Sequence, residues 1–436
     1  MSESFLIRGA RIDGAAAADI LIEGGLIAEV GTGLTSAGAT VVDAAGLIAL
    51  PGLVDLHTHL REPGYEASET ILTGSQAGAA GGYSALFAMP NTSPVADTAG
   101  VVEQELALGE AAGYVTVQPI GAVTVGQKGE RLAELGAMAQ SRARVRVFSD
   151  DGFCVWDPLI MRRALEYVKA FDGVIAQHAQ DPRLTEGAQM NEGRVSAELG
   201  LAGWPAVAEE AIIARDVLLA EHVGSRLHVC HLSTAGSVDI VRWAKKRGIA
   251  VTAEVTPHHL LLTEELVRDY DARFKVNPPL RRDEDVQAVR EGLADGTIDI
   301  VATDHAPHPA EAKACEWHAA ANGMVGLESA LRVVQQAVVD TGMLDWADVA
   351  RVMSRTPAAI GRLAGHGRPI AAGEPAHLTL HDPAGGGVFG TADLAGRSTN
   401  SPYLGRELPG RTRWTFHAGR ATWRDGALAP AEEVAS

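Results

Sequence analysis

The segment 53–63, LVDLHTHLREP, carries the residues with the clearest chemical meaning in this chain. His57 and His59 are two residues apart and follow an apolar run that is typical of a buried strand. Side chains at positions i and i+2 of a strand point to the same side, so the two imidazoles would face one point and supply half of a metal site. Arg61 continues on that side, where its guanidinium would bind an anionic substrate.

Other residues of metal-binding type also stand at the ends of apolar segments. Asp151 follows RVRVF, His178 ends GVIAQH, His231 ends RLHVCH and Asp304 ends IDIVATD. Nitrogen and oxygen ligands of this kind suit one or two Zn²⁺ ions. A single His-x-His or strand-end Asp is often incidental. The same context at every one of these positions, however, predicts a single metal centre.

Such residues need an architecture that brings the ends of many strands together. Residues 54–364 alternate short apolar segments with longer helical patterns. The candidate strands are YSALFAMP, YVTVQPIGAV, RVRVF, GVIAQH, RLHVCH, IAVTAEV and IDIVATD, and candidate helices include 157–171 and 237–247. Alternation repeated about eight times is typical of a (β/α)8 barrel, whose active-site residues lie at the C-terminal ends of the strands.

The two ends of the chain share a different pattern. Residues 1–53 and 365–436 contain short segments in which apolar residues alternate with polar ones and Gly, for example FLIRGARI and TRWTFHAGRATWRDG. This alternation predicts β-strands. We therefore expect an α/β protein in which a TIM-like (β/α)8 barrel, residues 54–364, is accompanied by a small β-sandwich domain formed by both chain termini.

Composition narrows the classes of function. Hydrophobic residues make up 46% of the chain, which favours a folded core over wholesale disorder. The formal net charge of −18 argues against a nucleic-acid-binding protein. Cys154, Cys230 and Cys315 do not make a disulfide framework, and the sequence has neither a signal peptide nor a membrane-spanning run. We expect a cytoplasmic protein that binds neither nucleic acid nor membrane.

Eight motifs, in order, resemble those of class I dihydroorotases of the amidohydrolase superfamily, in their actinobacterial form. They are VDLHTHLREPG, FAMPNTSPVADT, FSDDG, QHAQD, CHLST, AEVTPHHL, KVNPPLR and ATDHAPH, and with PAHLTLHDP the match spans nearly the whole chain. The resemblance implies reversible interconversion of N-carbamoyl-L-aspartate and L-dihydroorotate in pyrimidine (UMP) biosynthesis. It implies Zn²⁺ held by His57, His59, Asp151, His178, His231 and Asp304.

The same resemblance assigns residues to the substrate. Six residues are implied to bind it: Arg61, Asn91 and His308 at its carboxylate, Asn277 at the ring, and Asn322 and Gly323 through their loop backbone. A guanidinium offers paired donors to two carboxylate oxygens, which suits the role of Arg61. Asp304 is the expected catalytic residue. A metal lowers the pKa of its bound water to about 7, and the metal-bound hydroxide would attack the ring carbonyl. Asp304 would then pass a proton to the leaving nitrogen.

The remaining histidines have less specific contexts. Six lie in polar or terminal segments and are expected at the surface: His222, His318, His366, His377, His381 and His417. Four residues beside the expected ligands are candidates for supporting them: Asp150, His258, His259 and His305. His228 stays unassigned, and Lys313 is expected to shape the loop after His308.

Two alternative functions remain open. Hydantoinases and dihydropyrimidinases resemble this barrel but bridge two metals with a carboxylated lysine. Residues 149–152, SDDG, have no lysine, and an uncharged ring would not need Arg61. A non-catalytic scaffold homologue would usually lose metal histidines that this chain keeps. Three further points stay open. The sequence does not give the number of metals or show an association with aspartate carbamoyltransferase. A homodimer is the default expectation at this chain length.

Overall fold

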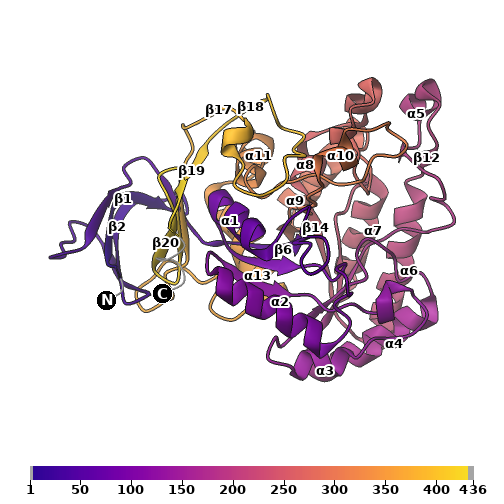
Figure 1. The fold of residues 1–436 in the computed structure, drawn as a ribbon, viewed down its shortest axis with the longest axis horizontal. Helices are drawn as coiled ribbons and strands as arrows, with labels where there is room; N and C mark the ends of the chain where they lie inside the picture. The colour runs from indigo at the N-terminus through magenta and orange to yellow at the C-terminus, as the bar shows by residue number, and fades with distance from the viewer. Residues whose placement is uncertain (1–2, 431–436) are drawn as a thin grey trace.

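Two parallel sheets form the centre of the computed structural model, which describes residues 3–430 (Figure 1). The first has the order β6-β7-β8: β6 Leu53–Thr58, β7 Tyr83–Ala88 and β8 Thr116–Pro119. The second has the order β9-β10-β13-β14-β15: β9 Val147–Phe148, β10 Val174–Gln177, β13 Leu227–Val229, β14 Val251–Val255 and β15 Ile300–Val301. Isolated parallel bridges, Gly121 to Phe148 and Thr58 to His305, join the edges of the two sheets. The predicted α/β fold is confirmed, and both pairs of edges meet, as closure of a barrel requires.

The central strands are shorter than the apolar segments that predicted them. RVRVF contains only β9, and IDIVATD contains only β15. The chain leaves the sheet where the site begins. His231 and Asp304, just beyond β13 and β15, have positive φ values of 31° and 49°. Because a strand needs negative φ, neither residue can extend the ladder of hydrogen bonds.

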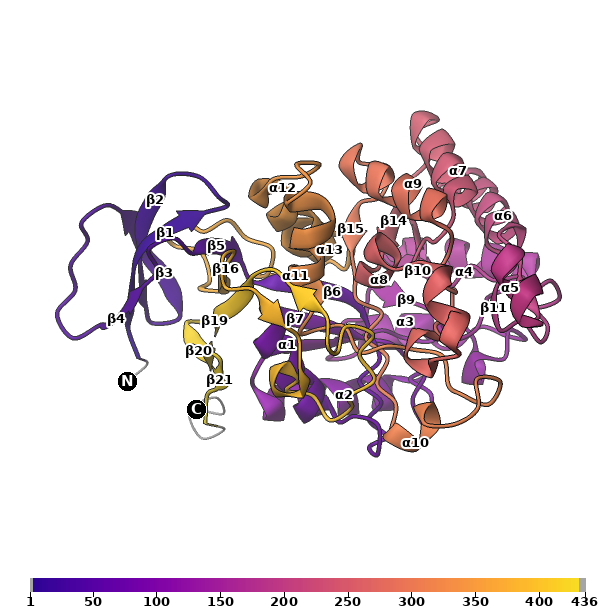
Figure 2. The same ribbon diagram turned by 90° about the horizontal axis from the view of Figure 1, so that it is seen from above.

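Helices separate and surround these strands (Figure 2). They are α1 Ile71–Gly81, α2 Ala99–Ala112, α3 Leu135–Gln140, α4 Pro158–Val168, α5 Arg194–Leu199, α6 Val207–Val223, α7 Ala235–Lys246, α8 Pro257–Leu261, α9 Asp283–Ala294, α10 Ala310–Lys313, α11 Ala330–Val334, α12 Trp346–Ala350 and α13 Thr356–Ile360. Within residues 3–430, no helix has both the length and the apolar character needed to cross a membrane.

Local capping explains where the two predicted helices begin. Asp157 Oδ1 accepts from the backbone N–H of Leu159 (2.8 Å), and Pro158 opens α4, as predicted. The α-helix ends at Val168 and a 3₁₀ turn continues to Phe171. α7 begins two residues before the predicted start, because the Thr234 side chain caps it.

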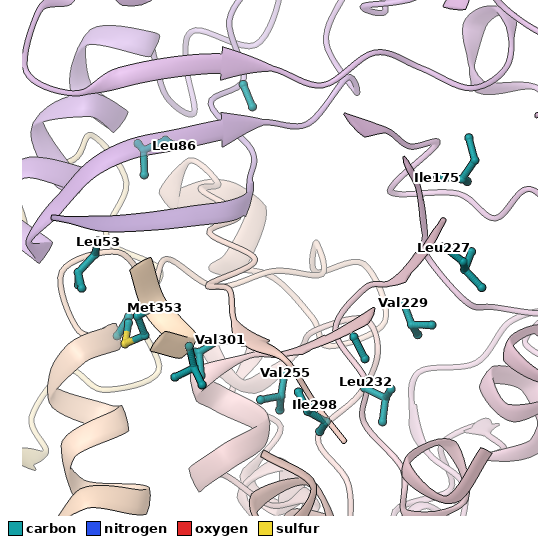
Figure 3. Close-up of a cluster of buried hydrophobic side chains, with 14 of the residues drawn as sticks. Leu53, Leu86, Ile175, Leu227, Val229, Leu232, Val255, Ile298, Val301 and Met353 are labelled. Carbon is teal, nitrogen blue, oxygen red and sulfur yellow. The ribbon is translucent and has the colours of Figure 1, made fainter. Parts of the chain in front are cut away.

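Successive residues of the central strands pack on opposite faces. Leu53 and Leu86 belong to a large core shared with the helices, part of which is drawn in Figure 3. Their neighbours Val54 and Phe87 pack in a separate core on the other face of the same strands. Burial on both faces is typical of parallel sheets. The strand ends are therefore held on a rigid base.

Both ends of the chain form one nine-stranded sheet, in which indigo and yellow strands lie side by side at one end of the molecule (Figures 1 and 2). The order is β21-β20-β19-β16-β5-β1-β2-β3, with β4 beside β1. The strands are β1 Phe5–Ile12, β2 Ala17–Glu23, β3 Leu26–Gly31, β4 Thr40–Asp43, β5 Ile48–Pro51, β16 Leu378–Asp382, β19 Arg411–His417, β20 Arg420–Arg424 and β21 Ala427–Leu428. Antiparallel pairing of β5 with β16 joins the two ends, as predicted. The domain boundaries 1–53, 54–364 and 365–436 stay predictions.

One stretch of the C-terminal region leaves the terminal sheet and reaches the central strands. Residues 383–410 run between β16 and β19 and contain the short pair β17 Gly387–Val388 and β18 Glu407–Leu408. Phe389 and Tyr403 in this stretch are buried. Asn400 Nδ2 donates to the carbonyl oxygens of Ala306 (3.0 Å) and Gly323 (3.2 Å). Part of the predicted terminal domain therefore supports loops beside the expected site. A second short pair, β11 Met190–Asn191 and β12 Gly203–Trp204, lies elsewhere in the chain.

The prediction that six histidines lie at the surface is wrong for His366 and His381, which are both buried. His377 and His417 are half-buried, and burial lowers the pKa of His377 to about 4 and that of His417 to about 3. His222 and His318 are exposed, as predicted. The error has a physical cause. His381 lies on β16, an interior strand of the terminal sheet, and its Nε2 contacts Gln335 Oε1 (2.8 Å).

Candidate metal centre and substrate cavity

The six predicted metal ligands meet at the C-terminal ends of the central strands, and all six are buried. They form two clusters that share Asp151, and the ligand atoms within each cluster lie within 4.8 Å of one another. The first cluster comprises His57, His59, Asp151 and Asp304, and the second comprises Asp151, His178 and His231.

The two carboxylate oxygens of Asp151 face different pairs of imidazoles. Its Oδ2 lies 3.3 Å from the Nε2 atoms of both His57 and His59. Its Oδ1 lies 3.2 Å from His178 Nδ1 and 3.2 Å from His231 Nε2. One carboxylate therefore stands between two groups of nitrogen donors, an arrangement that fits a ligand shared by two cations.

A buried carboxylate that sequence analysis missed orients two of these histidines. Glu254, on β14, accepts from His57 Nδ1 (2.5 Å), His228 Nε2 (3.0 Å) and the backbone N–H of His231 (3.1 Å). Burial alone would raise the pKa of Glu254, but the imidazoles of His57 and His228 bring it well below its usual value. Glu254 therefore holds a proton on His57 Nδ1, so Nε2 is the nitrogen that faces the cluster. The signal in the sequence was an acidic residue inside the apolar segment IAVTAEV.

The imidazoles of His59 and His178 are oriented in the same way, and the donor set fits a divalent metal. His59 Nδ1 contacts Asn91 Oδ1 (2.9 Å), and His178 Nε2 contacts Gln180 Oε1 (2.7 Å). Each contact leaves the second ring nitrogen to face the carboxylates. His57 Nε2 is buried without a hydrogen-bond partner, so a cation would satisfy it. Neutral imidazoles with carboxylates are the ligands that Zn²⁺ and similar ions prefer.

The backbone at the site is strained and is held by a second buried carboxylate. Arg61, His231 and Asp304 have φ values of 66°, 31° and 49°, in the left-handed region that costs about 1–3 kcal/mol for residues other than Gly. Asp55, on β6, accepts from the backbone N–H groups of His57 (3.1 Å) and Thr303 (3.1 Å). Burial raises the pKa of Asp55 to about 6. Asp55 thus joins the strand end that carries His57 to the one that precedes Asp304.

Charges inside the cluster compensate one another. Burial alone would raise the pKa of Asp151, but His57 and the other imidazoles bring it well below its usual value. Burial alone would lower the pKa of His57, but Asp151 and Glu254 raise it well above its usual value. Protons and a metal therefore compete for the same nitrogens.

A cavity of about 280 Å³ opens over the cluster, and all six residues predicted to bind substrate line it. Arg61 Nε donates to the carbonyl oxygen of Pro307 (3.2 Å), and burial lowers the pKa of Arg61 only to about 10, so it stays cationic at pH 7. Asn277 Nδ2 donates to Gln180 Oε1 (2.8 Å), and its buried Oδ1 has no hydrogen-bond partner. The Asn277 oxygen is therefore free to accept a hydrogen bond.

The loop on the far side of the cavity is tied down by a histidine and a lysine. His308 Nε2 donates to the carbonyl oxygen of Asn322 (2.7 Å). Burial, with the nearby Arg61, lowers the pKa of His308 to about 3, so His308 is a neutral donor. Lys313 Nζ donates to the carbonyl oxygens of Ala321 (2.8 Å) and Lys275 (3.0 Å). The contacts of Lys313 agree with its expected role in shaping this loop.

The residues expected to support the ligands have varied contacts. Asp150 Oδ1 accepts from the backbone N–H groups of Val123 (2.8 Å) and Thr124 (3.0 Å), which fixes the loop that carries Asp151. His305 Nδ1 accepts from the backbone N–H of Gly326 (3.2 Å). The buried rings of His258 and His259, in α8, pack against each other with centroids 4.6 Å apart.

Comparisons with related sequences show the family, and a solved structure shows the fold. A family model described as Dihydro-orotase-like matches residues 46–237. A dihydroorotase of Leifsonia xyli is 76% identical over 426 residues, covering 98% of this chain and 97% of that protein. A dihydroorotase of Mycobacterium tuberculosis is 54% identical over 427 residues, covering 98% and 99%. The solved L-hydantoinase (dihydropyrimidinase) of Arthrobacter aurescens has a TM-score of 0.86 at 23% identity, covering 99% and 98%, which shows a shared fold.

Replacing Glu254 tests its role in orienting His57. Glu254→Gln should weaken metal binding about 10–100-fold, because outer hydrogen-bond partners of metal ligands typically contribute that much. Competition with a chromophoric chelator measures the affinity. Glu105→Gln is the matched control. Glu105 is also fully buried, and burial raises its pKa well above the usual value, so glutamine imitates its neutral form. Equal affinities for the two variants would contradict the assignment.

Proposed function

The chain belongs to the dihydroorotase family, and we propose that it reversibly converts L-dihydroorotate to N-carbamoyl-L-aspartate, as a step of pyrimidine biosynthesis. It is a hydrolase acting on cyclic amides. The observation that carries the proposal is the meeting of two histidine–carboxylate clusters with Arg61 in one small cavity. The cavity thus combines a place for an electrophilic metal with a cation suited to the free carboxylate of the substrate.

We propose that the clusters hold two Zn²⁺ ions, with Asp151 as their shared ligand. His57, His59 and Asp304 would complete one site, and His178 and His231 the other. The separate directions of the Asp151 oxygens support this assignment. When bound, the metal supplies the Lewis acidity that activates water and polarises the amide carbonyl.

Asp304 would move the proton. Its Oδ1 lies 3.1 Å from His59 Nε2, and its side chain lines the cavity. In ring opening, an oxygen from water joins the carbonyl carbon, the carbon–nitrogen bond breaks, and the nitrogen gains a proton. Asp304 would take that proton from the water and deliver it to the nitrogen. The imidazoles of His57 and His59 keep the pKa of Asp304 below its usual value against the effect of burial, so Asp304 is an unprotonated carboxylate before the reaction.

The cavity wall would hold the substrate in one orientation. Arg61 would pair with the carboxylate, assisted by Asn91 and His308, and Asn277 Oδ1 would accept from the ring. Asn322 and Gly323 would contribute backbone groups. The carbonyl oxygen of Asn322 already accepts a hydrogen bond from His308 Nε2. To contact the substrate, this oxygen would have to share that hydrogen bond or release it. Arg61, cationic and half-buried, would contribute most of the discrimination against uncharged rings.

The bridges between the sheet edges support a closed eight-stranded barrel with a terminal β-sandwich. We propose a cytoplasmic homodimer, in keeping with the three unpaired cysteines and with exposed apolar side chains at Phe153 and Trp156 that an interface would cover. If the protein associates with aspartate carbamoyltransferase, it would do so as an active enzyme and not as a scaffold without activity of its own.

The proposed reaction predicts a sharp substrate preference. The purified, zinc-loaded protein should open L-dihydroorotate and leave dihydrouracil, which lacks the carboxylate, nearly untouched. Chelator treatment should abolish the activity, and zinc should restore it. Loss of the ring amide's ultraviolet absorbance measures both reactions. Preference for dihydrouracil would move the chain to the other cyclic amidases, and inactivity on both would support a scaffold role.

Removing the proposed proton carrier should stop turnover. Asp304→Asn should lower kcat about 10²–10⁴-fold, the usual contribution of general acid–base catalysis, while zinc content stays close to that of the wild type. Steady-state kinetics and atomic emission measure the two quantities. Asp239→Asn, on a side chain that is 78% exposed, makes the same chemical change and should leave kcat unchanged. A near-normal kcat in Asp304→Asn would remove Asp304 from proton transfer.

Removing the proposed carboxylate partner should mainly weaken binding. Arg61→Ala should raise KM for L-dihydroorotate about 10–100-fold, corresponding to the roughly 1.5–3 kcal/mol of a hydrogen bond to a charged group. Arg61→Lys should recover part of that loss, since it keeps the charge without the planar fork. Arg163→Ala, at a side chain that is 59% exposed, is the control. An unchanged KM in Arg61→Ala would exclude the carboxylate contact.

A further inference from the structure

Two residues that do not line the substrate cavity connect a candidate metal ligand to a candidate substrate residue. Gln180 Oε1 lies 2.7 Å from Nε2 of His178 and accepts a hydrogen bond from Asn277 Nδ2 (2.8 Å). On its other side, Gln180 Nε2 donates to Thr185 Oγ1 (2.7 Å). Gln180 and Thr185 line a separate cavity of about 70 Å³, which shares Asn277 with the substrate cavity. They can therefore influence the substrate only through the side chains that they contact.

The direction of this chain of hydrogen bonds is fixed at its far end. Thr185 Oγ1 lies 2.8 Å from the carbonyl oxygen of Asp181, and a carbonyl oxygen can only accept. The single hydroxyl proton of Thr185 is used there, so toward Gln180 the hydroxyl must accept. The nitrogen of the Gln180 amide therefore faces Thr185, and its oxygen faces His178 and Asn277. A reversed amide would make the oxygens of Gln180 and Asp181 compete for one proton.

The turn that carries Thr185 keeps this hydroxyl in place. Thr185 is buried, and its backbone N–H also donates to the carbonyl oxygen of Asp181 (3.2 Å). Asp181 Oδ1 accepts from the backbone N–H groups of Arg183 (2.9 Å) and Leu184 (3.1 Å). The acceptor that determines the direction of the chain thus belongs to a turn with its own hydrogen bonds.

The oxygen of Gln180 in turn determines the orientation of its two neighbours. It holds a proton on His178 Nε2, so Nδ1 is the nitrogen that faces Asp151 Oδ1 (3.2 Å) in the second cluster. It also binds the NH₂ group of Asn277, so Oδ1 is the atom of that amide left without a partner. A reversed Gln180 would present a donor to both neighbours. Each would then turn an acceptor toward Gln180 and away from its role in the site.

We propose that Gln180 and Thr185 are positioning residues for both halves of the site. Through one amide they fix which nitrogen of His178 faces the metal and which atom of Asn277 faces the substrate. The substrate half of this proposal rests on the proposed reaction, whereas the metal half does not. Because one oxygen serves both neighbours, loss of the Thr185 hydroxyl should weaken zinc binding and substrate binding together.

Two substitutions at Thr185 separate the effect of its hydroxyl from that of its bulk. Thr185→Val removes the hydroxyl with little change of shape, and Thr185→Ser retains it. Thr185→Val should weaken zinc binding and raise KM for L-dihydroorotate, each about 2–10-fold, the usual net contribution of one hydrogen bond. The kcat of the zinc-saturated enzyme should stay unchanged, since only binding is lost. Thr185→Ser should have wild-type values. Competition with a chromophoric chelator and steady-state kinetics give the two measurements.

Thr415→Val is the matched control. Thr415 is also buried, and its hydroxyl also donates to a backbone carbonyl oxygen, that of Ala79 (2.7 Å), but it lies on β19 in the terminal sheet. This variant should keep wild-type zinc affinity and KM. Equal zinc affinity and equal KM in Thr185→Val and Thr185→Ser would overturn the proposal. The zinc measurement needs no turnover, so inactivity of the wild type on L-dihydroorotate would refute the proposed function alone.

A double-mutant cycle with Asn277→Ala distinguishes positioning from a general loss of stability. Once the Asn277 amide is absent, Thr185→Val should have no further effect on KM, because the hydroxyl acts on the substrate only through that amide. A KM effect of Thr185→Val that persists in full beside Asn277→Ala would contradict the substrate half of the proposal.

Neutron diffraction from deuterium-exchanged crystals of the zinc-loaded wild type tests the direction of the chain without any variant. The hydroxyl deuteron of Thr185 should point to the carbonyl oxygen of Asp181, and the deuterated amide nitrogen of Gln180 should face Thr185. A hydroxyl deuteron that points to Gln180 would overturn the proposal.

Discussion

The carboxylate of Asp151, buried between two pairs of imidazoles, is the group on which the rest of the site depends. A buried charge is tolerated only when partners surround it. Here the partners come from β6, β10 and β13, which belong to both central sheets. The sheets must therefore keep the ends of these strands at fixed distances, and their burial on both faces does so.

Support for this arrangement comes from groups that do not touch the substrate cavity. Glu254 accepts hydrogen bonds from the His57 ring and from the backbone N–H of His231. Asp55 accepts hydrogen bonds from the backbone N–H groups of His57 and Thr303. These buried carboxylates hold ligand residues in backbone conformations that would otherwise be unfavourable. On the other side, Asn400 brings the C-terminal region against the loop containing Gly323. The candidate metal ligands, the two central sheets and the C-terminal region thus form one continuous hydrogen-bonded unit.

Local patterns in the sequence were sufficient for much of this molecule. Alternation predicted the strand Phe5–Ile12 with the bounds that the structure shows, because period-two patterning is a property of neighbouring residues. The spacing of His57 and His59, and the repeated ligand at strand ends, predicted which side chains would gather. The nitrogen and oxygen donors also favour a divalent ion such as Zn²⁺, since coordination preference belongs to the atoms and not to the fold, and the identity of the ion stays a prediction.

Contacts between distant segments decided the rest. Glu254 lies 197 residues from His57 along the chain, so no local pattern could pair them. Burial of His366 and His381 depends on which strands are interior and on what covers them, whereas their sequence context indicated a surface. Residues 383–410 read as part of a β domain but pack beside the cavity. The sequence by itself determined the chemical groups and their local elements. Tertiary structure decided their partners, because burial and hydrogen bonding arise only when remote parts of the chain meet.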